Sequence, residues 1–233
     1  MRYKVIGDIH GRTNWKKLVD VDNAINIFIG DYFDPYDSNI DFDIMSDNFN
    51  EIIKLKKEHP DNVILLYGNH DYHYMADCTE HYSRFQIYCA RKIEKLLLDN
   101  DKYFDGIAYA IGDKYIVTHA GITNEWAMNR LPDTKVEPME MAKAINELWK
   151  ENKWAFSFEN NSGPYDYYGD TCTHSPIWIR PQTLDEHNLY KGTDVKQIIG
   201  HTQVSKVTEI NGLILVDCLG TVDNCYELEF EEN

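Results

Sequence analysis

Short apolar runs, separated by polar or helix-like segments, dominate the hydrophobic pattern of the chain. They span residues 3–6, 25–29, 63–67, 115–117, 197–199 and 213–216. Apolar runs of this length without helical spacing are typical of buried strands. The pattern therefore predicts strands at these six places, gathered into the core of the protein.

Helical spacing occurs between these runs. Residues 49–57 and 84–98 carry apolar side chains three or four positions apart among good helix formers, which indicates helices that cover a sheet. Pro138 followed by MEMAKAINELWKENKW predicts a helix with proline in its first turn. Its core-facing residues are expected to be Met141, Ile145, Leu148 and Trp149. The class is therefore mixed α and β.

The length of 233 residues suits one domain, which we expect to span residues 1–233. No apolar run approaches the roughly 18 residues that a membrane span needs. The sequence MRYKVIGDIHG enters folded-looking sequence at once, so we expect neither a signal peptide nor membrane attachment. These features favour a cytoplasmic protein.

Charge and cysteine content narrow the functional classes. The formal net charge of −16 opposes non-specific nucleic-acid binding, which depends on lysine and arginine. The five cysteines lack CxxC spacing, so neither a disulfide framework nor a thiolate zinc site is supported by spacing, and we expect reduced thiols. An acidic protein that binds an anion would need bound cations to invert the local field.

Residues capable of binding metals follow one apolar run after another. The motifs are GDIHG at 7–11, GDYFD at 30–34, GNHD at 68–71, THAG at 118–121 and GHT at 200–202. Any one of them has an ordinary structural explanation, because Gly-Asp is a common turn and a lone histidine is often structural. Five such motifs, each at the end of a strand, indicate a shared site, since α/β folds gather functional groups on these loops.

The side chains in these motifs suit one kind of chemistry. Carboxylate, amide and neutral imidazole groups together bind borderline divalent cations such as manganese, iron, zinc, cobalt or nickel. One bridging aspartate can hold two cations about 3.5 to 4 Å apart, the spacing of two-metal sites in phosphoryl transfer. The sequence therefore indicates a metal centre with two ions as the leading interpretation.

With these motifs in this order, the sequence resembles the calcineurin-like metallophosphoesterases, especially the branch of serine/threonine phosphatases and dinucleoside tetraphosphatases. Gln203 follows GHT where other branches have a second histidine. The resemblance implies a central β-sandwich of mixed sheets flanked by helices, and two divalent ions, manganese first among those above. It implies the following ligands: Asp8 and His10 for one ion, Asp31 as the bridge, and Asn69, His119 and His201 for the other.

The resemblance also implies roles beyond metal binding. His70 would protonate the leaving oxygen while Asp34 supports its imidazole, and Arg180 in SPIWIRP would grip the phosphate. Many relatives carry a second arginine directly after the aspartate that corresponds to Asp34, whereas this chain has Pro35. Arg12 and Arg84 are the candidates to replace it. Each of them also has a plain structural explanation.

The function implied is hydrolysis of a phosphate monoester by direct attack of a metal-bridging hydroxide, as in serine/threonine phosphatases. The substrate would be a phosphoprotein, a nucleotide or a small phosphoester. A hydrolase of dinucleoside polyphosphates or other nucleotides is the first alternative, and an inactive binding or scaffold protein the second. Residues 122–196 are expected to form a helical and loop excursion that shapes the substrate site; the sequence leaves the oligomeric state open.

Aromatic residues near the motifs have two interpretations. The stretch 72–82, together with Tyr165, Tyr167 and Tyr168, could line a pocket for a base or a peptide ring, or could simply pack. Residues 157–176 lack any period, and we expect an ordered loop there. His73, His81 and His174 are not required as ligands by their spacing.

Overall fold

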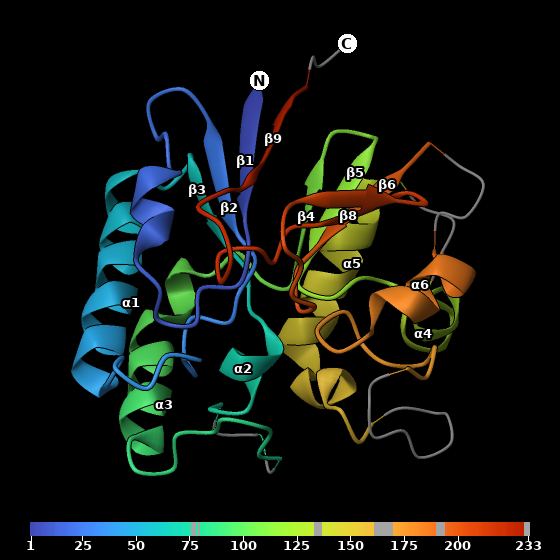
Figure 1. Cartoon of the computed structure of the whole chain (residues 1–233). Helices are drawn as coiled ribbons and strands as arrows, with labels where there is room; N and C mark the ends of the chain where they lie inside the picture. The colour runs from blue at the N-terminus through green and yellow to red at the C-terminus, as the bar shows by residue number, and fades with distance from the viewer. Residues whose placement is uncertain (76–77, 79, 133–136, 161–169, 190–193, 231–233) are drawn as a thin grey trace.

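The computed structural model describes residues 1–75, 78, 80–132, 137–160, 170–189 and 194–230. Two mixed sheets lie face to face, with helices on their outer sides (Figure 1). One sheet has the strand order β3-β2-β1-β9, and the other has the order β4-β5-β6-β8-β7. The expected β-sandwich of mixed sheets flanked by helices is confirmed.

Each sheet combines parallel and antiparallel pairs. In the first sheet β1, β2 and β3 are parallel and β9 is antiparallel to β1. In the second sheet β5, β6 and β8 are parallel, while β4 and β7 are antiparallel to their neighbours. The strands are β1 Arg2–Ile6, β2 Ile25–Phe28, β3 Val63–Leu65, β4 Ala108–Ile111, β5 Tyr115–Thr118, β6 Lys196–Ile199, β7 Thr208–Ile210, β8 Leu213–Leu215 and β9 Tyr226–Glu229.

All six strands expected from apolar runs are present as β1, β2, β3, β5, β6 and β8. The pattern missed β4, β7 and β9, which are edge strands of the two sheets. β4 (AYAI) is apolar throughout, so the same rule could have found it, whereas the edge strands β7 and β9 have exposed residues and need not be continuously apolar. In β9, for example, Glu227 and Glu229 are exposed.

The helices are α1 Phe42–Glu58, α2 Asn69–Tyr72, α3 Ala90–Asn100, α4 Asn124–Arg130, α5 Pro138–Glu151 and α6 Pro181–His187, with short 3-10 turns η1 Asn14–Lys17, η2 Asp101–Tyr103 and η3 Lys153–Phe156. The helix predicted over 84–98 begins only at Ala90. Arg84 cannot belong to it, because its left-handed φ of 66° does not occur in an α-helix. The helix expected after Pro138 is confirmed with proline in its first turn.

The core has a layer between the sheets and layers outside them. Between the sheets, β1, β2, β5, β6 and β8 contribute side chains such as Val5, Ile27, Val117, Ile198 and Ile214, all fully buried. Outside the first sheet lie α1 and α3, and α5 packs on β4 and β5 of the second (Figure 1). Residues 122–196 contain α4, α5, η3 and α6. The start of this segment is fixed to β6, where the buried amide of Gln197 accepts from the backbone N–H of Ile122 and donates to its carbonyl.

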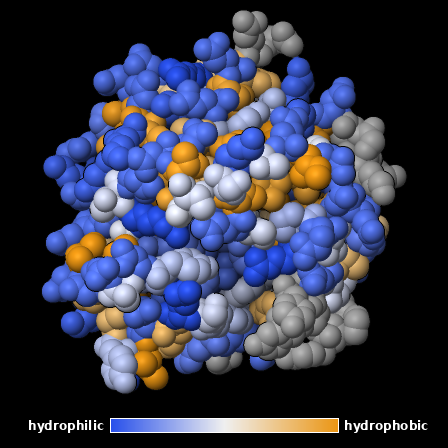
Figure 2. Space-filling model, in the orientation of Figure 1, coloured by the Kyte–Doolittle hydropathy of each residue, from blue (hydrophilic) through white to orange (hydrophobic). Residues whose placement is uncertain are grey.

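The surface shown in Figure 2 is mostly hydrophilic, with apolar side chains in small patches among polar ones. Within the described residues, no helix combines the length and the apolar character that crossing a bilayer demands.

Strand register brings the loops after β1 and β2 together. Tyr3 pairs with Ile25 and Ile6 with Phe28, so both strands end at one level. Their loops continue side by side, since the amide of His10 donates to the carbonyl of Asp31 at 2.6 Å and that of Gly11 to Tyr32 at 3.1 Å. Gly30 has a φ of 108°, and a Cβ there would overlap the backbone of Gly68. Close approach of three loops therefore depends on this glycine.

Candidate functional site

The six expected metal ligands come from loops that follow β1, β2, β3, β5 and β6, and the structure brings them together. The carboxylates of Asp8 and Asp31 and the imidazole of His10 offer ligand atoms within 4.8 Å of one another. The amide oxygen of Asn69 lies 2.8 Å from His119 Nε2 and 2.9 Å from His201 Nδ1. His119 Nε2 also lies 3.4 Å from Asp31 Oδ2, which joins the two groups into one cluster.

Four residues of this cluster have a left-handed backbone conformation, which residues other than glycine rarely adopt. His10, Asp31, Asp34 and His201 all have left-handed φ values, between 45° and 60°. Non-glycine residues adopt this region at a cost of about 1 to 3 kcal/mol each and do so mainly at functional sites. The fold therefore holds these four side chains in place against a local energetic preference.

Hydrogen bonds determine which imidazole nitrogen faces the centre. The Nδ1 atoms of His10 and His119 lie 2.9 Å from the carbonyl oxygens of Phe33 and Ile29. A carbonyl can only accept, so in both rings Nδ1 carries the proton and, in the neutral ring, Nε2 carries a lone pair. These lone pairs point at one carboxylate oxygen, Asp31 Oδ2, at distances of 3.5 and 3.4 Å.

Such a contact places electron pair against electron pair with no proton between them. A divalent cation would remove the conflict, because the two imidazole nitrogens and the carboxylate of Asp31 would then all bind the cation. Asp8 adds a further buried carboxylate, whose oxygens accept from the backbone amide of His201 at 3.1 and 3.2 Å. The residues present thus fit divalent metal ions by their donor set.

The pKa values of the histidines divide them into two groups. Burial lowers the pKa of His10 to about 4, and it also lowers the pKa values of His119 and His201. These three rings are therefore neutral near pH 7, as metal ligands must be. Burial also opposes the charged form of His70, but Asp31 and Asp34 outweigh it and raise the pKa of His70. His70 is thus the histidine disposed to hold a proton.

The carboxylate of Asp34 contacts the imidazole of His70. His70 Nδ1 lies 2.8 Å from Asp34 Oδ2, and the carboxylate is fully buried. Two partners were not anticipated from the sequence: His73 Nε2 lies 2.7 Å from the same oxygen, and the hydroxyl of Tyr74 donates to Oδ1. His73 and Tyr74 therefore contact the same aspartate that contacts the imidazole of His70.

Arg180 lies at the N-terminus of α6, beside the expected ligand His201. Its Nη1 donates to the carbonyl of His201 and to the hydroxyl of Thr202, both at 3.1 Å. Its positive charge helps to lower the pKa of His201 further, after burial. The guanidinium is therefore close enough to influence the electrostatics of the cluster.

Two more arginines lie at the other side of the cluster, where Tyr36 meets His10. The Tyr36 ring stands edge-on to His10 with 4.9 Å between ring centroids. The guanidinium carbons of Arg84 and Arg12 lie 3.9 and 5.6 Å from the centre of the Tyr36 ring. The position after Asp34 holds Pro35, and Arg12 and Arg84 instead lie around Tyr36, next to the expected ligand His10.

Two aspartates of the site were missed in the sequence. Asp217 follows the apolar run 213–216 as the other site residues follow theirs, so the same rule could have found it. Its carboxyl group bonds Asp8, and burial raises the pKa of Asp217 to about 6. Asp71, inside GNHD, accepts from the amides of Asp31, Gly68 and Tyr32 at 2.8 to 2.9 Å. It therefore holds the backbone of the expected bridging residue.

The remaining aromatic and histidine candidates lie outside the cluster or pack away from it. Tyr72 and Tyr74 are buried, which excludes them as an open pocket wall. His81 stacks on Phe85, and His174 packs against Phe158. The proposed wall residues Tyr165, Tyr167 and Tyr168, and much of the loop expected over 157–176, lie outside the described residues.

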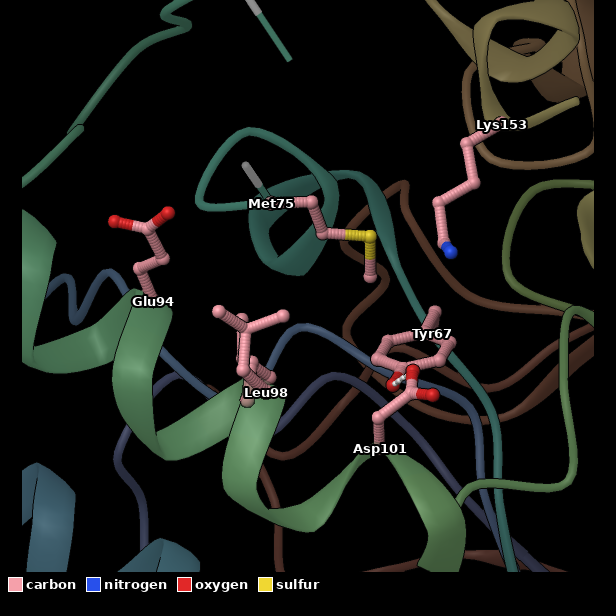
Figure 3. A pocket seen from close by; sticks show the side chains of 7 residues that line it. Tyr67, Met75, Glu94, Leu98, Asp101 and Lys153 are labelled. Carbon is pink, nitrogen blue, oxygen red and sulfur yellow. Dashed lines mark hydrogen bonds between the residues drawn. The ribbon is translucent and has the colours of Figure 1, made fainter. Parts of the chain in front are cut away.

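A separate cavity of about 160 Å³ lies between α3 and the start of η3 (Figure 3). It is lined by Tyr67, Met75, Glu94, Leu97, Leu98, Asp101 and Lys153. Tyr67 closes one side, and its hydroxyl donates to Asp101 at 2.7 Å. None of the expected metal ligands lines this cavity, so it is not where the clustered donors could act.

Comparison with known proteins agrees with this geometry. The family model for calcineurin-like phosphoesterases matches residues 1–205. A cold-active protein-tyrosine phosphatase of the psychrophile Shewanella sp. has a similar structure, with a TM-score of 0.58 and 21% identity over 94% of this chain and 71% of its own. A search of curated protein sequences found no match.

A protein serine/threonine phosphatase from Saccharomyces cerevisiae, described as similar to human phosphatase PP5, is also similar in structure. Its TM-score is 0.56 at 16% identity, over 96% of this chain and 70% of its own. At these identities the neighbours establish the fold, while the family model covers most of the sequence. The chain belongs to the calcineurin-like phosphoesterases.

Proposed function

We propose that this protein is a phosphatase that hydrolyses phosphate monoesters with two divalent metal ions, manganese first among the candidates. The observation that carries the proposal is the convergence of unshared electron pairs on Asp31 Oδ2 from His10 and His119. Asn69 and His201 extend this donor set on one side, and Asp8 on the other. All six expected ligand residues are present in the chain, which argues against an inactive scaffold protein.

The bound ions would supply Lewis acidity toward the phosphate and a water of lowered pKa. His70 would hold a proton at Nε2, because its Nδ1 is engaged by Asp34, and would deliver it to the departing oxygen. Asp34 would keep the ring in this orientation and stabilise its positive charge. Arg180 would turn from the carbonyl of His201 toward phosphate oxygens, which a guanidinium can hold in pairs.

Metal removal and substrate choice test the proposal directly. We expect turnover of p-nitrophenyl phosphate in Mn²⁺, its loss on chelation and its return on adding Mn²⁺. Bis(p-nitrophenyl) phosphate is the matched diester. Preference for the diester would favour a phosphodiesterase, and a well-folded protein that turns over neither compound, nor phosphopeptides or nucleotides, would contradict the proposal in favour of a binding protein.

Replacing Arg180 should separate phosphate handling from metal binding. Arg180→Ala is expected to lower kcat/KM for a monoester about 10- to 100-fold, because charge-assisted hydrogen bonds contribute about 1.5 to 3 kcal/mol. Metal content by elemental analysis should not change, since the arginine donates no ligand. Arg91→Ala, at an exposed arginine on α3, is the matched control. Equal loss of activity in both variants, or loss of metal in the first, would rule out this role.

A second candidate function is hydrolysis of dinucleoside polyphosphates or other nucleotides. The observation in its favour is the pair of guanidiniums from Arg12 and Arg84 that flanks Tyr36 beside His10. These cations, in addition to Arg180, suit a substrate with more than one phosphate. A panel of phosphopeptides and dinucleoside tetraphosphates discriminates the two candidates, since only the second predicts a clear preference for polyphosphates.

A further inference from the structure

Three side chains with metal-binding atoms meet away from the cluster described above. They are Glu125 in the first turn of α4, Cys172 in the segment before α6 and His187 at the last residue of α6. The carboxylate, thiol and imidazole each offer a ligand atom within 4.8 Å of the other two. We propose that they form a separate zinc site that fastens α6 to α4.

The hydrogen bonding of Glu125 is what points to an ion. Its Oε1 atom lies 2.7 Å from His187 Nδ1. Its other oxygen, Oε2, is buried and has no hydrogen-bond partner among the described residues, whereas buried carboxylate oxygens are normally satisfied. A cation held by Glu125 would satisfy this oxygen. The contact with His187 alone leaves it unsatisfied.

The distances and access suit zinc. Ligand atoms about 2.0 to 2.3 Å from a tetrahedral zinc lie about 3.3 to 3.8 Å from one another, inside the 4.8 Å span seen here. The contact between Glu125 and His187 would open by about half an ångström as the ion replaces their shared proton. The side chains of His187 and Glu125 are 37% and 32% exposed, so an ion reaches them without unfolding.

The donor set selects among metals. Thiolate with imidazole and carboxylate is a combination that zinc accepts, whereas magnesium, calcium and manganese favour oxygen ligands. Three protein ligands leave a fourth position for water. The site therefore differs in kind from the cluster around Asp31, which contains no sulfur.

An ion at this place would act on the helix that begins after Arg180. Arg180 directly precedes the first residue of α6, and His187 is its last. The seven residues span about 10 Å, so zinc would fasten the far end of the helix whose start presents the guanidinium. α4 and α6 lie side by side in Figure 1, and zinc would replace the hydrogen bond between Glu125 on α4 and His187 on α6. Occupancy would thus stabilise the position of Arg180.

Cobalt substitution tests the site independently of activity. The metal-free chain is titrated with Co²⁺, and the thiolate-to-cobalt charge-transfer band in the near ultraviolet is recorded. We expect the band in the wild type and its complete loss in Cys172→Ser, a change that nearly conserves shape at a half-buried position. Glu125→Gln and His187→Gln should each weaken cobalt binding at this site about 10-fold or more.

Matched variants show which site the band reports. Cys89→Ser, at another half-buried cysteine, and Asp31→Asn, in the other cluster, should both retain the band. Absence of the band in the wild type, or its persistence in Cys172→Ser, would overturn the proposal. Zinc should also raise the unfolding temperature of the wild type more than that of Cys172→Ser. A protein inactive on every phosphoester could still show the band, so failure of the two proposals is distinguishable.

Discussion

Asp31→Asn is expected to lower phosphatase activity by more than about 100-fold and to lower the content of both metal ions. Mutation of a residue that only orients a metal ligand already lowers metal affinity or activity about 10- to 100-fold. Asp31→Asn removes the charge of the proposed bridging ligand itself, so its effect should be larger. Asp31 Oδ2 is the atom that His10 and His119 face from two sides. An amide at this place would carry no charge to hold two cations together.

Elemental analysis and kinetics of Asp31→Asn, measured together, check this expectation. The side chain of Asp31 also accepts from the backbone amide of His70 at 2.8 Å, so folding must be verified by circular dichroism and thermal unfolding. Asp43→Asn, an exposed change in the first turn of α1, serves as a control for the loss of one negative charge. A folded Asp31→Asn variant with two bound ions and wild-type turnover would refute the bridging role.

His70→Asn is expected to reduce kcat by about 10²- to 10⁴-fold for substrates with poor leaving groups, the usual contribution of a general acid. Phenyl phosphate has a poor leaving group and should show a large loss. p-Nitrophenyl phosphate has a good leaving group that needs little protonation, so it should lose much less. The physical reason is that Asp31 and Asp34, against the opposing effect of burial, raise the pKa of His70, which favours the protonated ring that the proposed role requires.

A leaving-group series separates this role from a structural one. The slope of log kcat against the pKa of the leaving group should become steeper in His70→Asn, while metal content stays at the wild-type level. Asp34→Asn should shift the series in the same direction, because it removes the charge that supports the imidazole. Equal losses for all leaving groups would mean that His70 only maintains the structure of the site.

Much of the fold could be predicted from the sequence, because buried strands are recognisable as short apolar runs. The six apolar runs became β1, β2, β3, β5, β6 and β8, and residues of the site follow all six, Asp217 included. Of the missed edge strands, β7 and β9 carry exposed residues and resemble loops, whereas β4 (AYAI) is an apolar run that the same rule could have found. The start of α3 was also misplaced, since the sequence alone did not reveal the left-handed backbone at Arg84.

The sequence by itself determined which residues stand at the ends of strands, and therefore which donor types are available: carboxylates, one amide and imidazoles. This was possible because the period of burial and the placement of glycines are local properties. It also supported the family, through motifs in a specific order that a model over residues 1–205 confirms.

Only the tertiary structure decided how these groups face one another. Packing of the two sheets against each other places Asp8, after β1, against the amide of His201, after β6 and 193 positions later in the chain. Carbonyls of Phe33 and Ile29 select the nitrogens that face Asp31. The same holds for Glu125, Cys172 and His187, which come from three separate segments. Periodicity records which residues are buried, but distances between remote side chains arise from the pairing and packing of whole elements, which no local pattern encodes.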